Sequence, residues 1–268
     1  MAGVEQQAAQ QITKEQAIAN LQQTTDLGAR YYAAWWLGKF RVADKEAISA
    51  LTAALKDEID RTPDGGYPLR RNAATALGKL GDRAAVTPLI DCLECEDYYV
   101  RESAAQALEM LRDERAIPRL MSGLEGGVEA AIPVPGKPYL QQPYEAIIEA
   151  LGTLGAKDAI GLIEPFLSHP TEKVRYAAAR AMYQLTKEPK YADVLVSALG
   201  GKELQLRRSA LMDLGAIDYL GAAEAIAGTF AENSLKLVAL KGLLENHLQH
   251  QDPGEETWRV LSLMDDLL

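Results

Sequence analysis

The sequence has little cysteine, and this scarcity excludes a disulfide-stabilised fold. The only two cysteines, Cys92 and Cys95, cannot build a disulfide framework. Their C-x-x-C spacing could suggest a redox pair or half of a zinc site, but a second cysteine pair is missing and the three histidines are far away in sequence. We interpret the pair as two small helical residues in or near the core, and we expect no metal site. A transient carrier role for either thiol is the minor alternative.

The chain also lacks long apolar runs and an excess of positive charge. No run approaches the roughly 18 apolar residues that span a bilayer. The first residues, MAGVEQQAAQQ, lack the charged-then-apolar order of a secretory signal. We therefore expect a cytoplasmic protein without a membrane partner. The formal charge of −10 opposes binding to a phosphate polymer, so no nucleic acid is expected as a partner.

One helical pattern recurs seven times along the chain. It begins with a basic or polar start residue, has small residues three and four positions later, and has Leu or Met seven positions later. The start residues are Arg30, Arg70, Arg101, Tyr144, Arg175, Arg207 and Lys236. The segments read RYYAAWWLG (30–38), RRNAATALG (70–78), VRESAAQALEM (100–110), YEAIIEALG (144–152), VRYAAARAMY (174–183), RRSALMDLG (207–215) and LKLVALKGLL (235–244).

A second apolar pattern with helical spacing lies between these segments, as in AISALTAAL (47–55) and YADVLVSAL (191–199). Strand signals are almost absent. A two-helix unit of about 30 residues resembles the HEAT repeat, whose units bury their apolar faces only by stacking on one another. The sequence therefore predicts an all-α fold, a right-handed and crescent-shaped HEAT-repeat solenoid. Residues 1–268 would form a single domain of about seven helical hairpins.

Two intervals between repeats are longer than the others by about ten residues. The first insert, near 56–69, reads KDEIDRTPDGGYPL. The second, 122–143, reads SGLEGGVEAAIPVPGKPYLQQP, and its four prolines and four glycines forbid regular helix. Insertions in a solenoid gather on one face and often bind a partner or ligand. The alternative is a tolerated surface loop, but the stiffness of the second insert favours a functional role.

The first repeat concentrates aromatic rings at positions where the other repeats are mostly polar. One and five positions after the start residue it carries Tyr31 and Trp35, which share one stripe of a helix because they are four residues apart. Tyr32 and Trp36 lie about 100° around the helix. They could instead form an aromatic cap that seals the end of the solenoid. Exposed rings usually mark a binding surface, so we predict that these four rings contact a ligand or a partner protein.

The second helix of each HEAT pair generally lines the concave side of the solenoid. The expected groove would have rings at one end, followed by acids and bases. Such a surface suits a flat, conjugated, partly anionic molecule, because rings can stack and guanidinium groups can pair with carboxylates. It equally suits a protein partner. The charged groove residues are Arg71, Glu102, Glu145, Glu149, Arg180 and Arg208.

Several stretches together resemble the alpha (E-type) subunits of the heterodimeric phycocyanobilin lyases, the E/F class of bilin lyases. They are RYYAAWWLGKFRV, GGYPLRRNAATALGKLGD, LIDCLECEDYYVRESAAQALEML, GGVEAAIPVPGKPYLQQPYEAIIEALGTLGA and VRYAAARAMYQLT. The likeness runs from about residue 15 to residue 190 and includes both inserts. Beyond about residue 200 only the repeat pattern supports it. The E subunit of the related phycoerythrocyanin lyase-isomerase is the runner-up.

The resemblance implies an enzyme subunit that acts with an F-type partner subunit. The pair would attach phycocyanobilin, as substrate, through a thioether bond to a cysteine of the phycocyanin alpha subunit, without any cofactor. Catalysis would rest on holding the bilin in one orientation toward the acceptor thiol and on a carboxylate that favours the protonated bilin. A non-catalytic HEAT scaffold that docks proteins is the alternative from another class. A HEAT-type DNA glycosylase would need a basic surface, which this acidic chain lacks.

This interpretation gives each candidate residue a role. Carboxylates would protonate the bilin, guanidinium groups would hold its propionates, and aromatic rings would contact its pyrroles. The candidate carboxylates are Glu102, Glu145 and Glu149; the guanidinium groups belong to Arg71, Arg180 and Arg208; the rings belong to Tyr31, Tyr32, Trp35 and Trp36.

Overall fold

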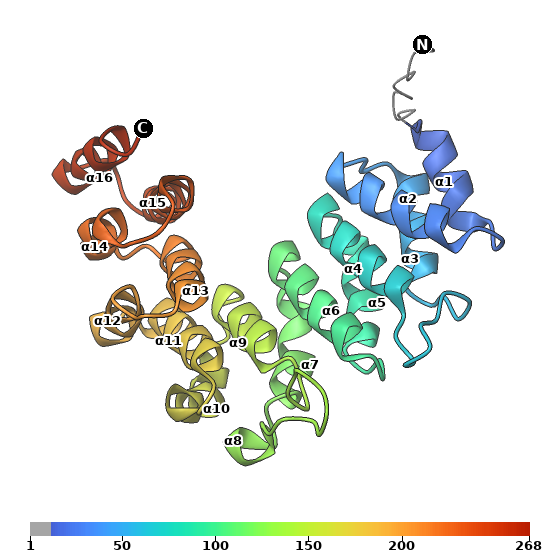
Figure 1. Ribbon diagram of the computed structural model, residues 1–268, viewed down its shortest axis with the longest axis horizontal. Helices are drawn as coiled ribbons and strands as arrows, with labels where there is room; N and C mark the ends of the chain where they lie inside the picture. The colour runs from blue at the N-terminus through green and yellow to red at the C-terminus, as the bar shows by residue number, and fades with distance from the viewer. Residues whose placement is uncertain (1–11) are drawn as a thin grey trace, which may run out of the picture. The chain divides into compact units, whose positions relative to one another are not determined.

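The computed structural model describes residues 12–268, which form stacked pairs of α-helices (Figure 1). Within this range there is no β-strand, only an isolated bridge between Pro133 and Leu140. The predicted all-α solenoid of HEAT hairpins is confirmed. The chain passes from a first compact unit to a second between Ala116 and Ile117. The single domain, the hand and the crescent shape stay predictions.

Acidic or hydroxyl side chains cap the first turns of the first three helices of the first unit. Thr13 forms a capping box with Gln16 at the first helix, and the carboxylates of Asp26 and Asp44 accept backbone N–H groups at the next two. The helices are α1 (Lys14–Gln22), α2 (Leu27–Lys39), α3 (Lys45–Ala54), α4 (Pro68–Leu80), α5 (Val86–Cys92) and α6 (Tyr98–Leu111), with short 3₁₀ turns at Arg83–Ala85 and Glu114–Ala116.

The second unit continues the same alternation of helices. Pro165 lacks the N–H that an α-helix needs, so α10 ends at Ile163 and the chain continues as a 3₁₀ helix over Glu164–Ser168. Further 3₁₀ turns cover Lys157–Ala159 and Leu220–Ala222. The α-helices are α7 (Ile117–Ser122), α8 (Gly127–Ala130), α9 (Tyr144–Thr153), α10 (Ile160–Ile163), α11 (Glu172–Thr186), α12 (Pro189–Ala198), α13 (Leu204–Gly215), α14 (Ala223–Gly228), α15 (Asn233–Leu248) and α16 (Glu255–Asp265).

All seven predicted repeat helices are present, as α2, α4, α6, α9, α11, α13 and α15. The Leu or Met seven positions after each start residue is fully or almost fully buried, from Leu37 in α2 to Leu243 in α15. The small residues three and four positions after the start are buried as well. The predicted apolar stripe is therefore the core of each unit.

A glycine eight positions after the start residue lets neighbouring repeat helices pack closely. A Cβ atom added to Gly38 would lie 2.8 Å from the Cα of Ala76, and one added to Gly78 would lie 2.7 Å from the Cα of Ala107. These distances are too short for a side chain, so only glycine permits this approach. The recurring A-L-G sequence thus has a packing cause.

The start arginines of three repeats fasten the turn that precedes their own helix. Each guanidinium donates from Nη1 to the backbone carbonyls five and six residues earlier, at 2.7–3.0 Å. Such carbonyls follow a helix end, where they lack helical partners. The repeated basic residue therefore has a structural role. The pairs are Arg101 with Cys95 and Glu96, Arg175 with His169 and Pro170, and Arg207 with Gly201 and Lys202.

Both inserts lie between helices, at the predicted places. The second contains one short helix, α8, whose first residue, Gly127, lies in the left-handed region (φ 60°). The expectation of no regular helix was wrong at this turn.

His169, which is only 1% exposed, binds the backbone of the second insert. Its Nδ1 accepts the N–H of Thr171 at 3.0 Å, so the ring proton lies on Nε2, which donates to the carbonyl of Ala131 at 2.9 Å.

None of the helices within residues 12–268 combines the length and the hydrophobicity of a membrane span.

Candidate functional site

Three aromatic side chains form an exposed face on α2, which we call the ring face. Tyr31 is 45% exposed, Tyr32 is 46% exposed and Trp35 is 43% exposed. A group of exposed apolar side chains on one helix face is informative, because contiguous apolar patches often mark binding surfaces. The predicted exposure of Tyr31 and Trp35 is therefore confirmed. Whether they contact a ligand stays a prediction.

The rings of α2 do not pair as their spacing indicates, which would place Tyr31 beside Trp35. The contact within the ring face joins Tyr32 and Trp35, with centroids 5.4 Å apart and planes tilted by 32°. Trp36 is half-buried and packs on Phe40 at 5.0 Å. Tyr32 thus belongs to the exposed face, and only Trp36 fits the alternative of an aromatic cap.

Arg71, one position after the start of the next repeat, is exposed on α4. Its guanidinium lies 5.0 Å from the ring centroid of Tyr99, which is itself 36% exposed. This geometry is a cation–π contact. The neighbouring Asn72 donates from Nδ2 to the carbonyl of Tyr31 at 3.2 Å, which ties α4 to α2 beside the ring face. Glu102 on α6 is half-buried.

Glu145 lies in the first turn of α9 in the second unit and is half-buried. Burial raises the pKa of its carboxyl above the usual glutamate value, although the charge of Lys173 opposes this shift. A carboxyl that keeps its proton to higher pH can act as a proton donor. The environment of Glu145 therefore favours its predicted role.

Glu149 and Arg180 meet a third charged residue that the sequence analysis overlooked. Arg180 lies between two carboxylates, with its Nη1 3.5 Å from Glu149 Oε2 and 3.7 Å from Asp213 Oδ1, and its Nη2 3.3 Å from Thr153 Oγ1. The side chains of Glu149, Arg180 and Asp213 are 17%, 12% and 6% exposed. The expectation that this position faces water was wrong in these repeats, because neighbouring helices supply opposite charges that enclose it.

Asp213 could have been found from the sequence. It stands six positions after the start residue, where the other repeats have Ala, Gly or Trp, and it is the only acid there. A charged residue inside a core stripe is informative, because such a group is rarely buried unless it is paired.

Arg208 on α13 is also engaged. Its Nε lies 3.2 Å from Glu232 Oε2, and its Nη2 contacts the other oxygen of the same carboxylate. This two-point contact raises the pKa of the guanidinium and lowers the pKa of Glu232. All three candidate arginines therefore have partners within their own unit.

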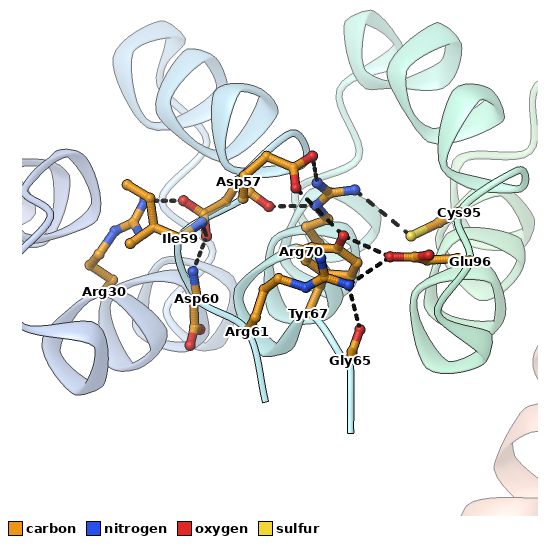
Figure 2. Close-up of polar contacts among 11 residues, drawn as sticks. Arg30, Asp57, Ile59, Asp60, Arg61, Gly65, Tyr67, Arg70, Cys95 and Glu96 are labelled. Carbon is orange, nitrogen blue, oxygen red and sulfur yellow. Dashed lines mark hydrogen bonds and ion pairs between the residues drawn. The ribbon is translucent and has the colours of Figure 1, made fainter. Parts of the chain in front are cut away.

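The first insert folds into a polar network that the sequence did not reveal (Figure 2). Tyr67 is 4% exposed, and its hydroxyl donates to Glu96 Oε1 at 2.8 Å. This hydrogen bond raises the pKa of Tyr67. The guanidinium groups of Arg61 and Arg70 lie over its ring, 4.5 Å and 3.8 Å from the centroid. The partners lie far apart in sequence, so spacing could flag the insert but not its contacts.

The two cysteines border this network and are both free. Cys92 is the last residue of α5, and burial raises its pKa to about 12, which disfavours the reactive thiolate. Cys95 lies in the following turn, so the prediction of two helical cysteines was wrong for this residue. Its sulfur accepts a contact from Arg70 Nη1 at 3.8 Å. A hollow of about 350 Å³ opens beside both thiols. No cluster of metal-ligating residues occurs within residues 12–268.

A larger cleft of about 670 Å³ lies in the second unit, away from the predicted site residues. Tyr183 and Tyr219 form one wall, with centroids 5.6 Å apart, and Lys187 is paired with Asp218 at 2.8 Å. His247 and His250 lie at its edge. Its opposing charges are thus already matched in part.

The comparisons with known proteins agree with the repeat architecture. Residues 61–130 and 141–228 match the family of HEAT repeats, and residues 29–57 match the PBS lyase HEAT-like repeat. Together these matches cover most of the described chain.

Relatives with 57–64% identity to the chain carry one name. The chain is 64% identical, over 98% of both chains, to the phycocyanobilin lyase subunit alpha of Picosynechococcus sp.. It is 64% identical, over 96% of both chains, to the protein of that name from Synechocystis sp.. The bilin biosynthesis protein PecE of Nostoc sp. is more distant, with 44% identity over 96% of both chains.

A solved structure is similar over the full length of both chains. It belongs to the complex of CpcE and CpcF of phycocyanin lyase from Nostoc sp. PCC7120, with 61% identity and a TM-score of 0.93.

Proposed function

Because the chain belongs to the family of phycocyanobilin lyase alpha subunits, we propose that it is the alpha-type subunit of a bilin lyase that works with an F-type partner. It binds phycocyanobilin and attaches it, through a thioether bond, to a cysteine of the phycocyanin alpha subunit. The observation that carries this proposal is the 64% identity over 98% of both chains. Sequences that similar along their whole length share their fold.

The partner is supported by the related structure, in which CpcE is in complex with CpcF. The acceptor protein and the bilin are inferred from the relatives' names. We expect the subunit to act in the cytoplasm, to need no cofactor besides its bilin substrate, and to bind neither nucleic acid nor membrane.

The reaction adds the acceptor thiol to the ethylidene group of the bilin. A bond forms between sulfur and carbon, the thiol loses its proton, and the neighbouring ring carbon gains one. The protein must hold the tetrapyrrole in one shape and present one face of it to the thiol, which is catalysis by orientation. Protonation of the pyrrole system makes the ethylidene more electrophilic.

Two features of the chain fit these needs, one in each unit. The ring face of α2 offers Tyr31, Tyr32 and Trp35 for stacking on a flat conjugated molecule. Glu145 of α9 has a carboxyl with a raised pKa, which suits a proton donor. Each assignment is tested on its own.

The arginine assignments are weaker. The guanidinium of Arg71 lies over the ring of Tyr99. Arg180 lies between two carboxylates, and Glu232 contacts Arg208 at two points. A propionate would have to displace these partners. Arg71 is the most accessible of the three and the best remaining candidate.

Two alternatives are less well supported. The phycoerythrocyanin lyase-isomerase subunit is disfavoured because identity to PecE is 44%, against 64% to phycocyanobilin lyase alpha subunits. A scaffold that only docks proteins would leave the bilin unchanged.

The decisive experiment is co-expression of this chain with bilin synthesis and the phycocyanin alpha subunit, with and without the F-type partner. We expect a covalent bilin adduct only when both subunits are present. Mixing the purified subunits with phycocyanobilin should sharpen and red-shift its absorption. An unchanged spectrum and no adduct would favour the scaffold.

A further inference from the structure

The start arginine of the first repeat differs from those that follow. Arg101, Arg175 and Arg207 bind backbone carbonyls of their own turn. Arg30 donates from Nε to the carbonyl of Leu21 in α1 at 3.3 Å, and from Nη2 to the carboxylate of Asp57, a residue of the first insert, at 2.7 Å. Both side chains are almost buried, with 7% and 5% exposure. The first insert therefore supplies an almost buried carboxylate to a start arginine, whereas Glu172, the carboxylate that pairs with Arg175, is 44% exposed.

Asp57 also contacts the start arginine of the second repeat. Arg70 donates from Nε to the backbone carbonyl of Asp57 at 2.6 Å, and from Nη2 to the carboxylate of Glu58. Figure 2 shows Asp57 between the two guanidinium groups, one from α2 and one from α4. A single insert residue thus links the beginnings of two repeat helices.

The insert holds the carboxylate of Asp57 in a fixed direction. Its second oxygen, Oδ2, accepts the backbone N–H groups of Ile59 at 3.2 Å and Asp60 at 2.8 Å. A carboxylate that accepts local N–H groups and a guanidinium has little freedom to turn. The far end of the insert is fixed in turn by Tyr67 and Arg61, which both contact Glu96.

We propose that the first insert orients the ring face of α2, and that Asp57 is the positioning residue through which it does so. Arg30 directly precedes Tyr31 in α2, so the direction of its side chain fixes the rotation of the helix at the ring face. A binding constellation must be held closely to retain its geometry, because a displacement of about 1 Å can cost two orders of magnitude in rate. The proposal rests on the proposed function, since bilin is the molecule that the rings are expected to contact.

Fluorescence of α2 tests the positional claim without any bilin. The chain has three tryptophans, of which Trp35 and Trp36 lie in α2 and Trp258 is 67% exposed in α16. In a Trp258→Phe background all tryptophan emission comes from α2. Asp57→Asn keeps the size of the side chain but removes its charge, and its NH2 group must face either Arg30 or the N–H groups of Ile59 and Asp60. We expect this variant to change the emission maximum and the acrylamide quenching of the folded protein.

Steady-state transfer with the F-type partner tests the functional claim. Asp57→Asn and Arg30→Lys should each raise KM for phycocyanobilin about tenfold while kcat changes little, since displaced rings bind the substrate and the transition state less tightly by the same amount. Because the two residues form one contact, the double variant should be no worse than the poorer single variant. Arg30→Lys keeps the charge and gives the same test if Asp57→Asn fails to fold.

The matched control is Thr229→Ala in the second unit. Thr229 is 7% exposed and its hydroxyl donates to the carbonyl of Leu199 at 2.9 Å, so its loss lowers stability without touching α2. We expect a lower melting temperature, unchanged quenching and an unchanged KM. The control thereby separates general destabilisation from repositioning.

Two results would overturn the inference. In the first, Asp57→Asn behaves like Thr229→Ala and affects only the melting temperature. In the second, KM rises while quenching stays at the wild-type value, so that Asp57 would act on the bilin directly. Failure of the wild-type pair to bind phycocyanobilin would instead overturn the proposed function, whatever the fluorescence shows.

Discussion

The residue five positions after the start residue is exposed in α2 but mostly buried in α9 and α11. In α2 it is Trp35, which is 43% exposed beside Tyr32. In α9 and α11 it is Glu149 and Arg180, whose side chains are 17% and 12% exposed and paired with each other. Equivalent positions of one repeat thus carry free apolar surface in one unit and enclosed charge in the other.

The difference shows that the repeat determines the direction of a side chain but not which neighbouring side chains it contacts. The charges of the second unit mostly satisfy one another, so little of their interaction energy is left for a ligand. The rings of α2 have no such partners to displace. Binding energy for a flat molecule should therefore come first from the ring face.

The largest effect should follow removal of the cation from the enclosed cluster. Arg180→Met would leave the carboxylates of Glu149 and Asp213 buried without their common partner. We expect the free energy of unfolding to fall by about 3 kcal/mol. Urea denaturation of the isolated chain measures this.

Arg180→Lys is the matched control for that experiment, because it keeps the charge and should cost less. An unchanged urea midpoint for Arg180→Met would mean that water solvates the carboxylates of Glu149 and Asp213. The contrast between enclosed charges in the second unit and exposed rings in α2 would then be lost.

Removal of the exposed rings should impair binding and leave the fold intact. We expect Tyr31→Ala combined with Trp35→Ala to reduce bilin transfer at least about tenfold, since each stacked ring contributes roughly 1 kcal/mol. Helical circular dichroism should not change, because both side chains are exposed. Loss of helicity would show that the rings are structural and would contradict the comparison.

The carboxyl of Glu145 should make stability depend on pH in a defined direction. Burial raises its pKa in the folded chain above the usual glutamate value, so the folded state holds the proton to higher pH than the unfolded state. Stability therefore falls as pH rises through the folded pKa. Glu145→Gln should be more stable than wild type near neutral pH, and the gain should vanish below about pH 4.5. Thermal melts at several pH values measure it, and a gain that grows toward acid would exclude burial as the cause.

The smallest effect is expected at the cysteines, which belong neither to the ring face nor to the charged cluster of the second unit. Cys92→Ser with Cys95→Ser should retain bilin transfer with the F-type partner, because burial disfavours the Cys92 thiolate. Abolished transfer in a folded variant would instead support a transient carrier.

The sequence predicted the helices and the ring face because both depend on local periodicity. Leu37 and its equivalents mark the core by spacing alone, and Tyr31 and Trp35 stand out against polar siblings. Even so, the ring contact joins Tyr32 to Trp35, since rotamers rather than spacing decide which rings meet.

Long-range charge pairing could not be predicted in the same way. Asp57 meets Arg30 across 27 residues, and Arg180 meets Asp213 across 33, with nothing in the intervals to indicate it. Such pairs depend on how neighbouring helices stack, which sequence spacing does not encode. The acid at position 213 was nevertheless a usable signal, because its siblings at that position are not acidic.

In three repeats, the start arginine binds the carbonyls of the turn before its own helix, so the hydrogen bonds that hold this turn lie within one short segment of the chain. When a stretch of DNA that encodes such a hairpin is duplicated, the copy brings its turn carbonyls and the guanidinium that binds them. The turn of the new segment therefore keeps these contacts, while its apolar face still packs against neighbouring hairpins. An array built this way can lengthen or shorten by whole hairpins, and protein engineers could exchange α12–α13 as a cassette on the same basis.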